Sequence, residues 1–317
     1  MTMHNSRTLS YAALFTATCG WSLSPVFIRF LSGAYDPFTQ ALIRYTGAAL
    51  PLAVYSLHAH RADLWRALRR LRPTIGLALV NATMQTAWTV AIYHTTATTA
   101  QLMSKLQIPI IIIFSYLLFK EERAVIRSPL FIIGAFLGLL GVAGVLMDDP
   151  SAPLVPQVNF AVLLLVYVAV SWSVYAVWGK HAVADIHPVP IFTVVAVYTT
   201  LYFAVLSAIV GSPGTLVTAG AGTDALALLS GTLPIAAAHC TFLYAQKHLG
   251  AAFCASIIML NPLLTHLMAL FLWPDEYMIW VQWLGAALLI GGSFMVIHAE
   301  RRTAAAALAA GVDGPAS

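Results

Sequence analysis

The chain has 317 residues, of which 60% are hydrophobic and only 9% are charged, and its formal net charge is +4. Soluble globular domains carry roughly 25% charged residues, so a single soluble core would leave too little polar surface to cover it. The composition therefore excludes an ordinary soluble protein and favours one whose solvent is the lipid bilayer.

Apolar runs follow one another along the chain, each near the ~20 residues that a helix needs to cross a bilayer. We expect helices over 9–31, 37–58, 73–95, 98–119, 128–147, 158–180, 188–210, 225–246, 251–272 and 277–298. Proline follows Asp36 and His187, as is common at helix starts, and turn-forming residues cluster at 148–150 and 211–214. The predicted fold class is all-α, a polytopic membrane protein with ten transmembrane helices.

Positive charges predict how these helices are oriented. Thirteen of the 16 Lys and Arg residues lie at the chain termini or in loops that follow the even-numbered predicted helices, and five of them lie between residues 61 and 72. None lies in a loop that follows an odd-numbered helix. The positive-inside rule places such basic loops in the cytoplasm. We expect a bacterial inner-membrane protein with both termini cytoplasmic, in which topology rather than nucleic-acid binding explains the arginine-rich loop.

Sequence motifs recur at a nearly constant offset. Trp21 matches Trp172 at an offset of 151 residues, and Pro109 matches Pro262 at 153. Each half would then hold five helices, and because five is odd, the second half is inverted relative to the first, an arrangement common in secondary transporters. We divide the chain into a first repeat, a second repeat and a disordered tail: 1–150, 151–300 and 301–317.

The repeats also carry a family pattern. The second half contains Gly250-Ala251-Ala252 and Leu260-Asn261-Pro262-Leu263, and in both halves an acid, Glu122 or Asp275, follows the proline by thirteen residues. This pattern resembles the EamA-type branch of the drug/metabolite transporter superfamily over nearly the whole chain, although Pro274 precedes the second acid where a Gly-Glu pair is usual. The resemblance implies alternating access around a central cavity, and substrates such as amino acids, often exported.

Three cations lie outside the basic loops. Arg29 is near the outer end of its helix, whereas Arg44 and Lys105 lie about 12 Å below the outer boundary at 1.5 Å per residue. All acidic residues fall in loops, at helix ends or in the tail, so no carboxylate is expected at that depth. We expect Lys105, beside Gln101, to meet an anionic group such as a substrate carboxylate. For Arg44, hydrogen bonding to the backbone or snorkelling is the favoured interpretation, with substrate contact as the alternative.

Polar and aromatic residues predict a cavity between the halves. Asn81, Gln85 and Trp88 share one helix face, and Trp88 corresponds to His239 at the offset of 151. Trp21 and Trp172 lie near mid-helix, where an interfacial belt does not explain them and packing is the alternative. The predicted substrate-binding residues are Lys105, Gln85, Trp88, Trp21, Trp172, Tyr175, His239, Gln101 and Arg44.

Three further features concern mechanism. His239 and His266 are the expected proton carriers if transport is proton-linked, with uniport and exchange equally open. Pro109 and Pro262 predict helix kinks, either as hinges or as static features of packing. Glycines over 138–144 predict close helix packing within the fold rather than dimerisation.

The predicted function is secondary transport of small metabolites, with export of amino acids or related carboxylate-bearing compounds as the leading interpretation. Import or exchange of organic anions or sugar phosphates is the alternative. A lipid-modifying membrane enzyme is disfavoured, because no acidic, histidine or nucleophile motif for such chemistry is present. We expect no enzyme activity, cofactor, metal or nucleic-acid partner; the partners are a small solute and the bilayer, and the protein is expected to be a monomer, with a homodimer as the alternative.

Overall fold

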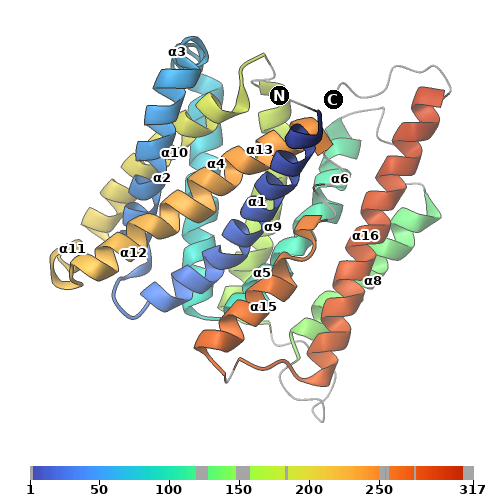
Figure 1. Ribbon diagram of the computed structural model, residues 1–317. Coiled ribbons are helices and arrows are strands. Elements are labelled where there is room, and N and C mark those ends of the chain that lie inside the picture. Colours follow the sequence, from blue (N-terminus) through green and yellow to red (C-terminus); the bar gives the residue numbers. More distant parts are fainter. Residues whose placement is uncertain are drawn as a thin grey trace.

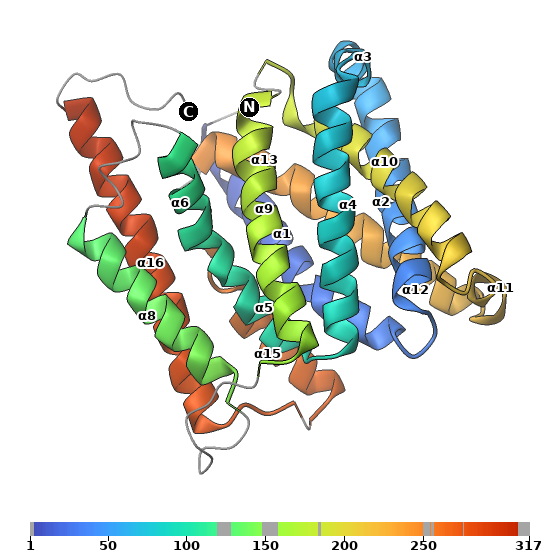
Figure 2. The ribbon, with the colours of Figure 1, turned by 180° about the vertical axis from the view of Figure 1, so that it is seen from behind.

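The computed structural model of the protein describes residues 3–118, 128–147, 158–182, 185–249, 254, 257–274 and 276–309. Every regular element within these ranges is helical, which confirms the predicted all-α class. Figures 1 and 2 show the helices as one bundle seen from two sides. Glu122 and Asp275, the two acids of the family pattern, and residues 310–317 of the predicted tail lie outside the described residues.

The helices follow the predicted order. Those of the first half are α1 (Met3–Leu31), α2 (Pro37–Ala59), α3 (Arg61–Arg69), α4 (Leu71–Tyr93), α5 (Ala97–Met103), a short 3₁₀ segment η1 (Ser104–Leu106), α6 (Gln107–Leu118) and α8 (Pro129–Val145). Those of the second half are α9 (Phe160–Ala182), α10 (Pro188–Ile209), α11 (Thr215–Thr218), α12 (Ala221–Gly231), a π segment η3 (Thr232–Ala237), α13 (Ala238–Leu249), α15 (Asn261–Leu272) and α16 (Trp280–Ala309).

Length and composition support a membrane protein, but they do not establish the number of crossings. Six helices of the described ranges are long and apolar enough to span a bilayer, and they lie at 8–31, 71–93, 160–178, 188–209, 221–245 and 280–303. Two others, α8 and α15, are apolar but shorter. The count of ten therefore stays a prediction. At the C-terminal end α16 continues to Ala309, so the expectation of a disordered tail from residue 301 was wrong for 301–309.

Local sequence explains where α2 and α10 begin. Asp36 caps α2, because its Oδ1 accepts hydrogen bonds from the backbone N–H groups of Phe38 (2.9 Å) and Thr39 (3.1 Å). His187 caps α10 in the same way through Val189 N–H. Proline occupies the first turn of both helices, as expected from the two Xaa-Pro pairs.

The arginine-rich segment expected as a loop contains the helix α3. Its Asp63 pairs with Arg66 within the helix. Arg70, which follows α3, makes two 2.7 Å bonds from its guanidinium to the carboxylate of Asp185 in the second half. Pairing of acids and bases along and beside a nine-residue segment, together with its buried Leu64, explains why it becomes helical rather than extended.

Helix directions establish that the two halves are inverted. Helices α1, α4 and α8 end at a pocket where α5, α9 and α16 begin. Because α9 corresponds to α1 and α16 to α8 in the repeat, each pair runs in opposite directions. Figure 1 shows the start of α1, the end of α16 and helix α3 at the other end of the bundle.

The predicted prolines break their helices rather than bending them. The segment expected as one helix over 98–119 changes from α5 to the 3₁₀ turn η1 and resumes as α6, with Pro109 in its first turn. In the second half, α15 starts at Asn261 after a turn at residues 259–260, with Pro262 in its first turn. A proline has no N–H for the carbonyl four residues earlier, so the helical ladder is interrupted just before each one.

Glycines allow α8 and α16 to pack closely, as both views show. A Cβ atom added to Gly141 would lie 2.4 Å from the backbone nitrogen of Leu289, and one added to Gly285 would lie 2.6 Å from that of Val145. Side chains do not fit at these distances, so only glycine permits this approach. The glycines of α8 therefore act in helix packing within the fold, as predicted.

Candidate functional site

A cavity of about 150 Å³ lies between the two halves at the level where helices α5–α6 and α15 are broken. Its wall combines aromatic and polar side chains from both halves. They are Trp21, Ser24, Tyr45, Asn81, Met84, Gln85, Trp88, Gln101, Ser104, Lys105, Gln107, Val168, Trp172, Phe192, Pro234, Ile235, His239, Ile258 and Asn261. We call this space the central cavity.

The structure brings most of the predicted binding residues together in this wall. The residues that line it are Lys105, Gln85, Trp88, Trp21, Trp172, His239 and Gln101. Two predicted residues, Tyr175 and Arg44, do not line the cavity. The binding roles of all nine residues remain predictions.

Lys105 is the cation of the central cavity. It is 2% exposed and sits in the 3₁₀ turn η1, from which its Nζ donates a hydrogen bond of 3.3 Å to the backbone carbonyl of Ile258. Pro262, four residues after Ile258, has no N–H to offer that carbonyl, so the oxygen is available to the ammonium group. Among the described residues no carboxylate pairs with Lys105. A buried ammonium with a single neutral acceptor is poorly compensated and favours an anionic ligand.

His239 presents one ring nitrogen to the cavity side. Its Nδ1 lies 2.7 Å from the carbonyl oxygen of Ile235, so Nδ1 carries the proton in the neutral ring and Nε2 is left as an acceptor. The imidazole stacks on Phe192, with 4.2 Å between ring centroids, and meets the edge of Trp21 at 5.2 Å. These contacts fix the ring orientation within an aromatic wall.

The repeat offset correctly pairs residues across this wall. Trp21 and Trp172, and likewise Trp88 and His239, are separated by 151 residues in the sequence and all four line the same space. In an inverted repeat, corresponding positions face a common centre from opposite sides. Aromatic faces of this kind contact apolar or cationic portions of a small solute.

Arg44 is held by hydroxyl groups instead. Its side chain is buried, Nε lies 3.2 Å from Ser230 Oγ and an NH2 group lies 2.9 Å from Ser24 Oγ. These bonds join α2 to α12 and α1, which supports the structural interpretation of this residue. Tyr175 packs beside Trp172, with 5.9 Å between ring centroids, behind the wall rather than in it.

Tyr45, Phe192 and Asn261 are among the wall residues that were not predicted from the sequence. Tyr45 accepts a 3.1 Å bond from Asn81, whose amide also reaches Thr199 at 2.9 Å. Asn261 is 2% exposed, and its Oδ1 has no hydrogen-bond partner among the described residues. Its position beside Pro262 at a predicted helix interruption was the signal that could have identified it.

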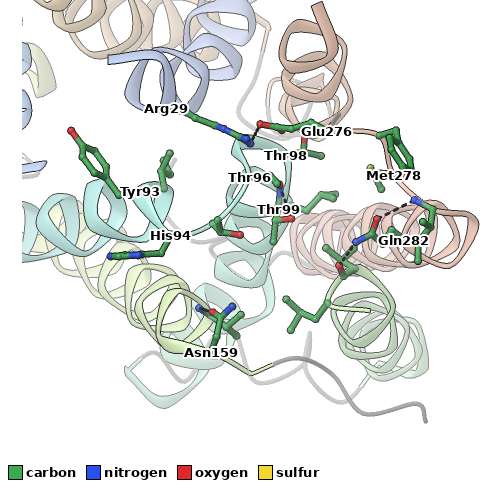
Figure 3. A pocket seen from close by; sticks show the side chains of 18 of the residues that line it. Arg29, Tyr93, His94, Thr96, Thr98, Thr99, Asn159, Glu276, Met278 and Gln282 are labelled. Atoms are coloured by element: carbon green, nitrogen blue, oxygen red, sulfur yellow. Dashed lines mark hydrogen bonds and ion pairs between the residues drawn. The ribbon is translucent and has the colours of Figure 1, made fainter. Parts of the chain in front are cut away.

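A second, larger space opens at the end of the bundle opposite α3. This vestibule has a volume of about 720 Å³ and is lined by helix ends, including residues of α1, α4, α8 and α16 (Figure 3). Arg29 pairs there with Glu276, whose side chain is only 2% exposed, and its guanidinium lies 4.9 Å from the ring centre of Trp273. Arg29, at the C-terminal end of α1, therefore has a carboxylate partner, whereas Lys105 has none among the described residues.

The two spaces are separated by about one helical turn. Along α4, Trp88 lines the central cavity and Ile92, one turn later, lines the vestibule. On α5 the adjacent residues Gln101 and Leu102 line the cavity and the vestibule, respectively. His266 belongs to neither lining and lies 3.3 Å from Thr98 Oγ1 through its Nδ1.

Comparison with known proteins gives a consistent result. The model of the EamA-like transporter family matches residues 8–147 and, a second time, residues 159–298. These stretches begin 151 residues apart, the offset found in the repeated motifs. No protein of curated function matches the chain. One solved crystal structure aligns with 92% of this chain and 98% of its own at 20% identity, with a TM-score of 0.62, which shows a shared fold.

Proposed function

The chain belongs to the EamA-like transporter family and is a multi-pass membrane protein, and from that premise we propose that it transports small carboxylate-bearing metabolites through the central cavity by alternating access. Export of amino acids or related compounds across the bacterial inner membrane is the form of this function that we favour. The proposal gives each of the features described above a role: the inverted halves, the broken helices and the buried cation.

The single observation that carries the proposal is the state of Lys105. Its ammonium group lies in a cavity wall made from both halves, bound to one backbone carbonyl and to no carboxylate among the described residues. A solute carboxylate would supply the missing negative charge and a charge-assisted hydrogen bond. Such a bond is worth about 1.5–3 kcal/mol, enough to select anions over neutral solutes.

Cavity size and charge narrow the class of solute. The central cavity is about 150 Å³, well below the roughly 300–1,000 Å³ of pockets that bind drug-sized ligands, which favours metabolites of amino-acid size. Of the described residues in its lining, Lys105 is the one Lys or Arg. A monocarboxylate matches one cation better than a doubly charged sugar phosphate does, so we place sugar phosphates second.

The architecture supports alternating access. The breaks before Pro109 and Pro262 lie at repeat-related positions and flank the cavity, where the interrupted backbone can bend with little loss of hydrogen bonding. Rocking of these helices would open the cavity to the vestibule in one state and to the α3 end in the other. If protons are coupled to transport, His239 is better placed than His266, because only His239 lines the cavity.

Flux into proteoliposomes tests the proposal. Purified protein is reconstituted and supplied with radiolabelled amino acids, plain monocarboxylates, neutral sugars and sugar phosphates. We expect saturable flux of one or more carboxylates that depends on Lys105, with the Lys105→Met protein as the matched control. Transport of neutral or cationic solutes that is equally fast in the Lys105→Met protein would refute the assignment.

A further inference from the structure

Asn261 is, after Lys105, a second buried polar residue of the central cavity whose hydrogen bonding is incomplete. It is the first residue of α15 and follows by three positions Ile258, whose carbonyl binds the Lys105 ammonium. Both residues belong to the cavity wall. The break in this helix therefore contributes two neighbouring elements to the cavity, one carbonyl that holds the cation and one side-chain amide.

The amide oxygen of Asn261 lacks a donor. It is buried, and no hydrogen-bond partner reaches it within the described part of the chain. Buried polar atoms are nearly always hydrogen-bonded, and an unsatisfied one is costly. Asn81 in the same wall provides the contrast, because its amide bonds both Tyr45 and Thr199. Because Asn261 lines the cavity, its Oδ1 is an unfilled acceptor next to the space that a solute would enter.

Comparison of the two repeats indicates that this polar pair is not a packing requirement of the fold. At the offset of 153 residues that relates the broken helices, Lys105 corresponds to Ile258 and Asn261 corresponds to Ile108. Each polar residue therefore occupies a position where the other repeat has isoleucine. An isoleucine satisfies the packing at these positions, so the polar side chains serve another purpose.

We propose that Asn261 is a specificity-determining residue whose Oδ1 accepts a hydrogen bond from an N–H group of the solute while Lys105 binds the solute's carboxylate. The inference rests on the proposed function and sharpens it: the preferred solutes carry an amine or amide near the carboxylate, and the corresponding plain acids bind more weakly. No carboxylate lines the cavity among the described residues, so the wall offers neutral acceptors to such a donor, and the Asn261 oxygen is one that no protein group occupies.

The experiment compares matched solute pairs in proteoliposomes. Each pair is an amino acid and the acid that lacks its amine: alanine with propanoate, leucine with 4-methylpentanoate, and phenylalanine with 3-phenylpropanoate. For the intact protein we expect half-saturating concentrations about tenfold lower for the amino acid of a transported pair, the size of one lost hydrogen bond to a charged group. The Asn261→Leu protein should lose this preference, because the half-saturating concentration for the amino acid rises about tenfold relative to that for the plain acid.

Controls separate this inference from the function on which it rests. The Asn81→Leu protein removes an amide of the same wall that is already bonded to Tyr45 and Thr199, so any loss of affinity should be the same for both members of a pair. Equal weakening of both members in Asn261→Leu, or an intact preference, would overturn the role of Asn261 and leave transport by Lys105 standing. If no carboxylate of either kind is transported in a Lys105-dependent way, both the inference and the proposed function fail. Asn261→Gln, which keeps the amide, should retain part of the preference and shows that the site still folds.

Discussion

The vestibule and the central cavity each contain a cation, but the two cations are compensated in different ways. Arg29 in the vestibule has the carboxylate of Glu276 and the face of Trp273. Lys105, about a dozen ångströms inside the predicted outer boundary at 1.5 Å per residue, has only the Ile258 carbonyl among the described residues. A paired charge stabilises a structure, whereas an uncompensated one remains available to a ligand. Under the proposed function, the vestibule is a structural and access region and binding occurs in the cavity.

The largest effect should come from removing the cavity cation. Lys105→Met deletes the ammonium group while it preserves the length of the side chain, and we expect carboxylate transport to fall roughly 100-fold, which corresponds to about 3 kcal/mol of lost binding. The unfolding midpoint in detergent should stay the same or rise, because a buried charge has been removed. Proteoliposome flux and thermal unfolding measure the two quantities. Unchanged flux would show that Lys105, like Arg29, takes no part in binding the solute.

Removing the carboxylate partner of Arg29 should have the opposite effect: stability falls and solute affinity hardly changes. Glu276→Gln leaves Arg29 without its carboxylate, and we expect a loss of about 2 kcal/mol in stability, moderated by the 24% exposure of the Arg29 side chain. Solute affinity should change less than twofold. Thermal unfolding and flux are measured side by side, and a second variant, Arg29→Met with Glu276→Leu, should recover most of the stability. A change in affinity without loss of stability would contradict the division of roles.

A new carboxylate in the cavity would make it resemble the vestibule. Asn261→Asp places a negative charge in the wall that contains Lys105, so it competes with the solute carboxylate for the ammonium group. We expect carboxylate affinity to fall roughly tenfold, about 1.4 kcal/mol. Counterflow with labelled solute measures the change. Combination with Lys105→Met should cause no further loss, since the cation that the new charge neutralises is already absent.

Arg44 should give the smallest effect, because hydroxyl groups rather than a solute occupy its guanidinium. Arg44→Lys cannot bond both Ser24 and Ser230, and we expect about 1 kcal/mol of lost stability with solute affinity within twofold. Ser230→Ala provides the matched test from the other side of the contact. A tenfold loss of affinity in either protein would return Arg44 to the binding site.

Part of the site could be predicted from the sequence, because spacing along the chain shows which residues share a helix face and which residues correspond in the two repeats. Helical spacing placed Gln85 and Trp88 on one side of α4, and the offset of 151 paired Trp88 with His239; both pairs of neighbours line the cavity. The same reasoning failed for Tyr175, one turn further along α9 from Trp172. A helix face is wider than a small cavity, so its periodicity does not determine which residue lies at the wall and which lies behind it.

The sequence by itself determined the solvent, the all-helical class, the family and the opposite orientation of the halves, because these depend on apolar length and on repetition along one chain. Only the tertiary structure decided the partners of the three cations outside the basic loops: Glu276 for Arg29, two serines for Arg44 and, among the described residues, a single carbonyl for Lys105. Each of these groups comes from a segment distant in the sequence. Which of them meet depends on how helices of the two halves pack, and that packing is not encoded in any one local pattern.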